Sequence, residues 1–353
     1  MLASYRQLLN TRSACRSIAL AAALAALPLS GCGNGKDVSA SAASPSASAS
    51  ASASAPASAS ASLSAVADAS ATASQAEYPR VFKDELGHEL TLPAVPARIF
   101  APSMEDSLLS LGVVPVAQWA NGSNVQDYLQ DQLAGVPKAD FSGGLPSPET
   151  VMGYKPDLIV LNNSYYAENG VYEQYSKIAP TYVFNNAATD LTSSIGQLGA
   201  LLGREAEATK ALENYRAKAE EAKQKLGALA EGKKAAIIRF NAKGMFLVGG
   251  DYFGGYVLAH DLGFGKVKPV EKESSADMSL ELLPDLDADY IFLVNDSHSG
   301  DAFVKELTDS ALWKNMKQVK EGHTYEVVDE SWLSGGLIAS GKVIDQTVGL
   351  LAP

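Results

Sequence analysis

The sequence predicts an α/β protein with two lobes, each built on a mainly parallel sheet, bridged by one long α-helix. Three observations predict this class, and the first two are an alternation of strand and helix patterns and a helical stretch that interrupts it. Short apolar segments alternate with amphipathic ones from Arg98 onward, which is the pattern of βαβ units. Residues 191–229 instead repeat apolar side chains at helical spacing. The strand and helix alternation then resumes from residue 233, so two α/β halves flank a helical middle.

The third observation is a repeated phrase, one copy in each half. "SPETVMGYKPDLIVLNNS" begins at Ser147 and "SLELLPDLDADYIFLVNDS" begins at Ser279. The residues that match between the copies are Ser147, Glu149, Asp157, Ile159, Leu161 and Asn163 with Ser279, Glu281, Asp289, Ile291, Leu293 and Asn295. Each copy predicts a helix start, a short helix and a buried strand. We therefore expect two similar lobes with a cleft between them.

The first lobe is expected at residues 77–200. Two short strands joined at Leu86 and Gly87 predict a hairpin. "RIFAPS" predicts a buried strand and "MEDSLLSLG" a short helix that ends at Gly112. Further strands are expected at "VVPVAQW", at "DLIVL" inside the repeated phrase and at "TYVF".

The bridging helix is expected at residues 201–231 and the second lobe at residues 232–353. Gly203 divides the helical middle into a short and a long helix, and Gly232 ends the long one. "KAAIIRF" and "MFLVGG" predict strands, and "GGYVLAHDLGF" predicts a helix. "SGGLIASGKVIDQTVGLL" predicts a closing helix.

The first 76 residues are not expected to belong to the fold. Three arginines precede the apolar segment "SIALAAALAALPLS", which is shorter than the run of about 20 apolar residues that spans a membrane. The "LSGC" that ends at Cys32 resembles the lipobox of bacterial lipoproteins. This resemblance implies a signal peptide at 1–31, cleavage before Cys32 and diacylglycerol on its sulfur. An ordinary signal peptide that contains a cysteine is the alternative.

A Ser/Ala-rich segment follows the predicted lipidation site. Its composition at residues 32–76 holds too little apolar area for a core, which predicts a flexible tether. The chain has two cysteines, Cys15 in the predicted signal peptide and Cys32. We therefore expect a folded part without a disulfide, a cysteine metal site or a cysteine nucleophile.

Composition and motifs exclude several function classes. The 353-residue chain has a formal net charge of −12 and no basic patch, which argues against nucleic acid as a partner. Its four histidines are scattered without the spacing of a metal site, so we expect no intrinsic metal or cofactor. No nucleophile-elbow or phosphate-loop motif is present, so no catalytic residue is expected.

Several segments, taken together and in order, resemble one family. They include "PARIFAPSMEDSLLSLG", "SPETVMGYKPDLIVL", "LGALLGREAEA", "SLELLPDLDADYIFL" and "WLSGGLIASGKVIDQ". From Tyr78 to its end the chain resembles the lipid-anchored substrate-binding proteins of ABC importers for iron–siderophore complexes, of the iron-hydroxamate type. The resemblance implies two Rossmann-like lobes bridged by one long helix, and a monomer on the outer face of the bacterial cytoplasmic membrane. It also implies that iron arrives already chelated, as an Fe(III)-siderophore complex.

The resemblance implies a docking role for the repeated glutamates. In such importers one acidic residue on each lobe pairs with an arginine on each subunit of a permease dimer. Glu149 and Glu281 match those positions, at the starts of equivalent short helices. The alternative is a plain preference for carboxylates in a first helical turn.

The residues expected to contact ligand follow the carboxyl ends of the predicted strands, where open α/β lobes bind ligands. Arg239 is the main candidate, because it is a charge near the end of an apolar strand and can form two hydrogen bonds to hydroxamate oxygens. A pairing with a nearby carboxylate is its alternative. The other candidates are Ser103, Trp119, Asn163, Tyr165, Tyr166, Tyr252, Phe253 and Trp332. For each aromatic one, packing in a core is the alternative.

The identity of the chelate stays open at this point. The loop "GGDYFGG" departs from the Trp and Arg that the resemblance to hydroxamate binders implies there. A catecholate, ferric citrate, haem or a cobalamin would suit the same architecture. A surface α/β hydrolase is a further alternative, without a nucleophile motif to favour it.

Overall fold

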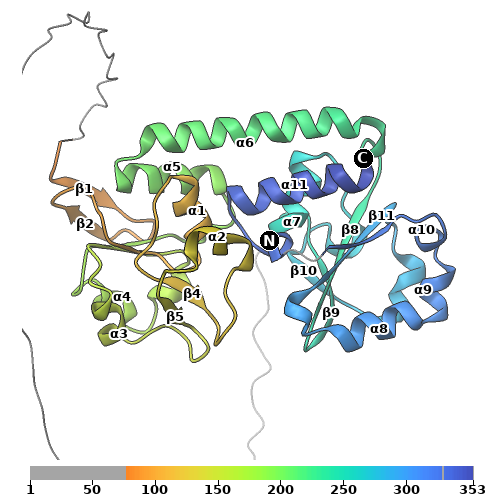
Figure 1. Ribbon diagram of the computed structural model, residues 1–353, viewed down its shortest axis with the longest axis horizontal. Helices are drawn as coiled ribbons and strands as arrows, with labels where there is room; N and C mark the ends of the chain where they lie inside the picture. Colours follow the sequence, from red (N-terminus) through yellow and green to blue (C-terminus); the bar gives the residue numbers. More distant parts are fainter. Residues whose placement is uncertain (1–76, 328–329, 353) are drawn as a thin grey trace, which may run out of the picture. The chain divides into compact units, whose positions relative to one another are not determined.

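The computed structural model describes residues 77–327 and 330–352. The predicted signal peptide, tether and lipidation site at Cys32 lie outside the described residues. The described part contains two α/β lobes and a long helix, as predicted (Figure 1). Among the described residues, no helix combines the length and apolar character needed to span a membrane.

The first lobe contains three small sheets (Figure 1). β3 (Ile99–Phe100), β6 (Leu158–Leu161) and β7 (Thr181–Val183) form a parallel sheet in the order β3-β6-β7. β4 (Gln118–Ala120) and β5 (Lys138–Asp140) form a parallel pair. Around them lie α1 (Glu105–Ser110), α2 (Gln130–Leu133), α3 (Pro148–Gly153), α4 (Val171–Tyr175) and α5 (Leu191–Leu202).

The predicted hairpin opens this lobe. β1 (Arg80–Lys83) pairs antiparallel with β2 (Glu89–Leu92). Asp84 fixes the turn, because its Oδ1 accepts hydrogen bonds from the backbone N–H groups of Leu86 (3.0 Å) and His88 (2.7 Å). Gly87 has a φ of +96°, a left-handed conformation that a glycine adopts without strain.

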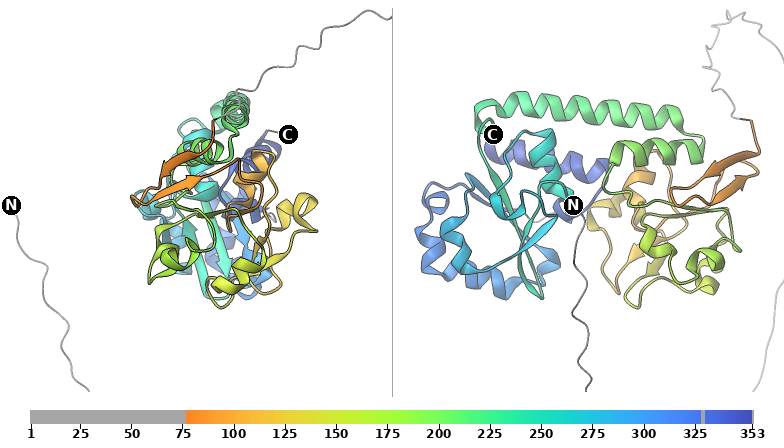
Figure 2. Two further views of the ribbon diagram at one scale, coloured as in Figure 1. Left: turned by 90° about the vertical axis from the view of Figure 1, so that its left-hand side faces the viewer. Right: turned by 180° about the vertical axis from the view of Figure 1, so that it is seen from behind.

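The long helix is α6, Glu205–Leu226. Gly203, with a φ of +63°, separates it from α5 as predicted. The helix ends at Gly227 rather than at the predicted Gly232, because Gly227 takes a φ of +47° and a short 3-10 turn follows. Tyr215, midway along α6, packs against the apolar cores of both lobes. Figure 2 shows α6 running along one side of both lobes.

The second lobe is built on one five-stranded sheet in the order β10-β9-β8-β11-β12. β8 (Ala235–Asn241), β11 (Tyr290–Asn295) and β12 (Thr324–Val327) are parallel, whereas β9 (Gly244–Val248) and β10 (Ser275–Met278) are antiparallel to their neighbours. The helices of this lobe are α7 (Phe253–Tyr256), α8 (Asp301–Asp309), α9 (Ala311–Asn315), α10 (Lys317–Lys320) and α11 (Leu337–Leu351).

The repeated phrase forms corresponding elements in the two lobes. In the first lobe it forms α3 followed by the parallel strand β6. In the second it forms a 3-10 helix, Leu280–Asp285, followed by the parallel strand β11. Pro284 lies inside that second helix and removes a backbone donor, which accounts for a 3-10 turn where the first lobe has an α-helix.

Asp106 of α1 joins the first lobe to α11. Its side-chain oxygens accept hydrogen bonds from the backbone N–H groups of Ile338 (2.9 Å) and Ala339 (2.8 Å), in the first turn of α11. Gly336 makes room for this contact, because a Cβ at Gly336 would lie 2.2 Å from the Cγ of Asp106. The buried carboxylate thus fixes the amino-terminal end of α11 to the first lobe.

Candidate functional site: a cleft between the lobes

A cavity of about 690 Å³ lies between the two lobes. This volume falls in the range of about 300–1,000 Å³ that small-molecule sites occupy. The first lobe contributes loops that follow β3, β4, β6 and β7, and the second contributes β8 and loops that follow β9, β11 and β12. Most of these loops follow the carboxyl ends of parallel strands, where the sequence predicts the site.

Eight of the nine residues predicted to contact ligand line this cavity. They are Ser103, Trp119, Asn163, Tyr165, Tyr166, Arg239, Tyr252 and Phe253. They come from five separate segments of the chain, so the fold gathers side chains that the sequence places far apart. Their contact with a ligand stays a prediction.

The ninth residue, Trp332, does not line the cavity. Its side chain is completely buried, lies 4.8 Å from the ring of Phe292 and donates a hydrogen bond from Nε1 to Gln346 Oε1 (2.8 Å). The segment from Leu333 to Gly336 that follows it does line the cavity. Trp332 therefore belongs to the core of the second lobe, the packing alternative that the sequence left open, and supports the cavity wall from behind.

The wall from the first lobe is aromatic and uncharged. Trp119 lies on β4, and Tyr165 and Tyr166 lie on a 3-10 turn after β6. Asn163 begins this turn, and its Oδ1 accepts a hydrogen bond from the N–H of Tyr165 (2.9 Å). The rings of Tyr165 and Tyr166 meet edge to face with centroids 5.8 Å apart, and Tyr165 is 70% exposed. Such rings offer apolar contact area with few rotatable bonds to immobilise.

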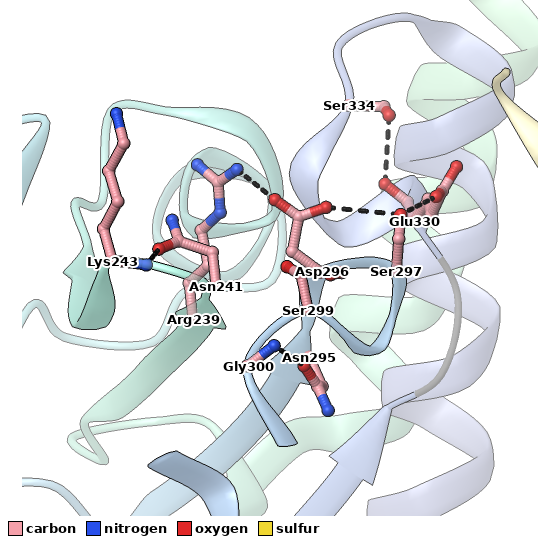
Figure 3. A network of polar contacts seen from close by, with 10 residues as sticks. All are labelled: Arg239, Asn241, Lys243, Asn295, Asp296, Ser297, Ser299, Gly300, Glu330 and Ser334. Carbon is pink, nitrogen blue, oxygen red and sulfur yellow. Dashed lines mark hydrogen bonds and ion pairs between the residues drawn. The ribbon is translucent and has the colours of Figure 1, made fainter. Parts of the chain in front are cut away.

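The wall from the second lobe carries the charges. Arg239 lies on β8 on the same side as Ile237 of the apolar core, and forms an ion pair with Asp296 after β11 (Figure 3). Asp296 is followed by Ser297, whose Oγ donates to Glu330 Oε1 (2.8 Å). Glu330 Oε2 accepts a hydrogen bond from the N–H of Asp127 in the first lobe (3.3 Å). The network thus connects the two lobes at the cavity.

The pairing of Arg239 leaves donors free for a ligand. Its side chain is 36% exposed, so the carboxylate of Asp296 covers only part of the guanidinium. Its Nε is buried and has no hydrogen-bond partner in the described structure. Gln126 Oε1 and Asn162 Oδ1, on two other residues that line the cavity, are likewise buried without a partner there. Unpaired buried polar atoms are costly, so their gathering at one cavity indicates a site that binds a polar group.

Backbone strain also gathers at this cavity. Ser103, Phe253 and Ser297 line it and have positive φ values of 61°, 48° and 47°. A residue with a side chain in this region costs on the order of 1 kcal/mol or more, and such residues cluster at ligand sites. The strain indicates that these three loops are shaped by the site rather than by local stability.

Glu149 and Glu281 lie outside the cavity. Both are exposed, each in the first turn of its short helix. The pKa of Glu149 is lowered by its own backbone N–H and by the Ser147 hydroxyl, and the pKa of Glu281 is lowered by the Ser279 hydroxyl and its own N–H. Both repeated glutamates are therefore ionised at neutral pH, and the same kinds of group lower the pKa of each.

Some cavity residues escaped the sequence analysis. Gln126, Asn186 and Glu330 line the cavity but were not predicted individually. Glu330 belongs to the loop after β12, which the strand-end rule does mark as a site segment. Gln126 lies in an irregular segment that follows β4, where no periodic pattern indicates which side chains turn inward.

Two further observations define the site. A second cavity, of about 650 Å³, shares Glu330 and is otherwise lined by Asp127, Tyr128, Glu326, Val327, Gln346, Gly349 and Leu350. It lacks the aromatic pair, the arginine and the strained loops, so the first cavity is the stronger candidate. No group of three or more His, Cys, Asp or Glu side chains that could hold a metal ion occurs in the described ranges.

Known proteins resemble this chain along most of its length. The family model described as "Periplasmic binding protein" matches residues 101–330. Two relatives come from Bacillus subtilis (strain 168), the "Probable siderophore-binding lipoprotein YfiY" and the "Iron(3+)-hydroxamate-binding protein YxeB". Each is 28% identical over 284 residues, which cover 75% and 77% of this chain and 86% and 85% of the relative.

A solved structure agrees with the same family. Staphylococcus aureus SirA complexed with staphyloferrin B superimposes with a TM-score of 0.65 at 28% identity, over 77% of this chain and 98% of SirA. The family model alone spans well over half of the 353 residues. The chain therefore belongs to the periplasmic binding protein family, and it is a binding protein rather than an enzyme.

Proposed function

We propose that this protein captures a ferric siderophore, of the hydroxamate class, in the cavity between its lobes and delivers it to an ABC importer. The observation that carries the proposal is Arg239, a partly exposed cation with a buried, unpaired Nε, set between aromatic walls. The name of the relative YfiY supports a siderophore as the ligand, and the name of YxeB supports the hydroxamate class.

The chemistry of the cavity suits a ferric trihydroxamate. Such a complex has an apolar body and hydroxamate oxygens that accept hydrogen bonds around the metal. Trp119, Tyr166 and Phe253 offer area for the body, and Arg239 offers charge-assisted hydrogen bonds to the oxygens. The ligand brings the iron, so the protein needs no metal ligands of its own.

We further propose that Glu149 and Glu281 dock the loaded protein on a permease dimer. Their support is the repeat itself, because two matched, exposed carboxylates, one on each lobe, suit a partner with two-fold symmetry. Lipidation of Cys32 would keep the protein at the outer face of the membrane, close to that partner.

A titration of tryptophan fluorescence tests the ligand class. The panel is ferrioxamine, ferrichrome, a ferric tricatecholate, ferric citrate and haem. Both hydroxamates should quench the fluorescence at lower concentration than the other three, because Trp119 lines the cavity whereas Trp313 and Trp332 are buried in the core. If neither hydroxamate quenches the fluorescence, the proposal is wrong.

Uptake measurements test the docking role. The double variant Glu149→Gln/Glu281→Gln should lose iron uptake and keep its ligand affinity. Glu221→Gln, an exposed carboxylate on α6, is the matched control and should transport normally. Normal uptake by the double variant would rule out docking through these residues and leave the binding function standing.

A further inference from the structure

We propose that the site selects ferric hydroxamates that carry a protonated amine, with Glu330 as the residue that binds the ammonium group. This inference rests on the proposed function and narrows its ligand class. It follows from the distribution of charge around Glu330, which lines both cavities.

The charge of the main cavity is negative. Among the residues that the structure describes, the charged ones that line it are Arg239, Asp296 and Glu330, one cation and two carboxylates. Asp296 forms an ion pair with Arg239, so these two charges largely cancel. Glu330 is left as the net charge of the cavity. An anionic chelate would meet this carboxylate and would have to compete with Asp296 for Arg239.

Glu330 has hydrogen bonds but no opposite charge. Its Oε1 accepts from the hydroxyl of Ser297 (2.8 Å) and its Oε2 from the backbone N–H of Asp127 (3.3 Å), both uncharged donors. No ion pair to Glu330 occurs among the residues that the structure describes. These two bonds fix the half-buried carboxylate in one position without neutralising it.

The neighbouring cavity extends the negative potential. Asp127 and Glu326 line it together with Glu330, and no basic residue is among the described residues of its lining. Val327, Gly349 and Leu350 add apolar surface beside these acids. A flexible alkyl chain that ends in an ammonium group matches this combination, because its methylenes can pack on the apolar part while its charge faces the carboxylates. The net charge of the whole chain, −12, attracts a cation in addition.

The direct test compares two ligands that differ only in this charge. Ferrioxamine B has an uncharged ferric trihydroxamate core and a pendant primary ammonium, and its N-acetyl derivative has the same core without the charge. Calorimetric titration of the full chain should show about five- to tenfold tighter binding of the amine form, the size expected for one half-buried ion pair. The ratio should shrink as salt is raised, because screening weakens the attraction.

Two variants locate the effect. Glu330→Gln removes the charge and keeps one of the two acceptor oxygens. It should reduce the ratio of the two affinities to about one, as removal of a single charge requires, because any loss from the broken hydrogen bond affects both ligands alike. Glu326→Gln should reduce the ratio only slightly, because this side chain is exposed. Glu221→Gln on α6, outside both cavities, is the control and should leave the ratio unchanged.

The outcomes separate this inference from the function on which it rests. Equal affinities for the two ligands in the unmodified protein, or a ratio that survives in Glu330→Gln, would overturn the inference and leave hydroxamate binding intact. Failure of both ligands to bind would overturn the proposed function itself. Tighter binding of ferric citrate than of either form would contradict the charge argument as well.

Discussion

The two lobes contribute different chemistry to the same cavity. The first lobe lines it with amides, hydroxyls and aromatic rings, and none of its sixteen lining residues is charged. The second lobe supplies Arg239, Asp296 and Glu330, which are all the charged residues of the lining in the described part of the chain. The lobes share a repeated phrase and a parallel α/β plan, yet the first lobe offers uncharged contact surface to a ligand and the second offers charged side chains.

The two lobes therefore have different roles in ligand recognition. The rings and apolar side chains of the first lobe can accommodate the body of many chelates, because apolar contact discriminates weakly between ligands of similar size. In the second lobe, the Arg239–Asp296 ion pair and the carboxylate of Glu330, which has no ion pair in the described structure, distinguish ligands by charge. Charge is the stronger basis for selectivity. Variants that change one wall of the cavity at a time test this division of roles.

The largest expected effect comes from the core behind the charged wall. Trp332→Ala should lower the free energy of unfolding by about 3–5 kcal/mol, because the side chain is completely buried against Phe292. Trp119→Ala, on the partly exposed wall of the first lobe, should cost clearly less. Urea unfolding monitored by circular dichroism measures both. A cost below that of Trp119→Ala would contradict the core position of Trp332.

The next effect concerns the carboxyl group behind the neutral wall. Glu105 is buried, its Oε1 accepts from the N–H of Trp119 (2.6 Å) and its Oε2 has no partner in the described structure. Burial raises its pKa to about 7. A carboxyl group with a raised pKa favours the folded state at low pH, so its contribution is lost as pH rises from about 4.5, the unfolded value, to about 7.

Glu105→Gln tests this pH dependence. Between pH 4.5 and pH 8, the free energy of unfolding should fall by about 3 kcal/mol less in the variant than in the unmodified protein, because one pKa unit corresponds to about 1.4 kcal/mol. Burial also raises the pKa of the neighbouring Asp106 to about 6, so a smaller fall should remain in the variant. Urea titrations at the two pH values give the numbers. An identical pH profile for the variant would show that Glu105 is not a source of the dependence.

Arg239 gives the next effect, this time on binding. Arg239→Ala should weaken ferrioxamine binding by about tenfold to a hundredfold, the value of charge-assisted hydrogen bonds, and leave Asp296 without its cation. Arg239→Lys keeps the charge but not the two-donor geometry, so its affinity for ferrioxamine should lie between those of the unmodified protein and Arg239→Ala. Calorimetry measures each affinity. Unchanged binding by Arg239→Ala would place the anchoring donor elsewhere in the cavity.

Tyr165 should give the smallest effect. Tyr165 is 70% exposed, and its ring meets that of Tyr166 edge to face. Tyr165→Ala should therefore weaken binding by about threefold or less, as expected for a contact at an exposed rim. The same calorimetric titration decides this. A loss as large as that of Arg239→Ala would mean that the tyrosine moves over the ligand on binding.

The sequence predicted those features that depend on periodicity and special residues. The break at Gly203, the hairpin at Leu86 and Gly87, and the parallel strands of the repeat follow from local patterns and are confirmed. Most of the cavity lining follows from one rule, that ligands bind beyond the carboxyl ends of parallel strands.

The remaining features depend on tertiary contacts that no local pattern records. The residues around Trp332 have the composition of a binding loop. Its ring nevertheless packs in the core, against Phe292 and within hydrogen-bond distance of Gln346. The pairing of Arg239 with Asp296 joins residues 57 positions apart. Arg239 lies on β8 and Asp296 directly follows the neighbouring strand β11, and the sequence does not specify this strand order. The bond between Asp127 and Glu330 likewise arises only where the two lobes meet.

A crystal structure of the protein with bound ferrioxamine B would show where the ligand binds. We predict that the iron complex lies in the cavity between the lobes, with Arg239 donating to hydroxamate oxygens, Trp119 and Phe253 against the body of the ligand, and the ammonium group at Glu330. A complex seated outside this cavity, or inside it without a contact to Arg239, would contradict this prediction.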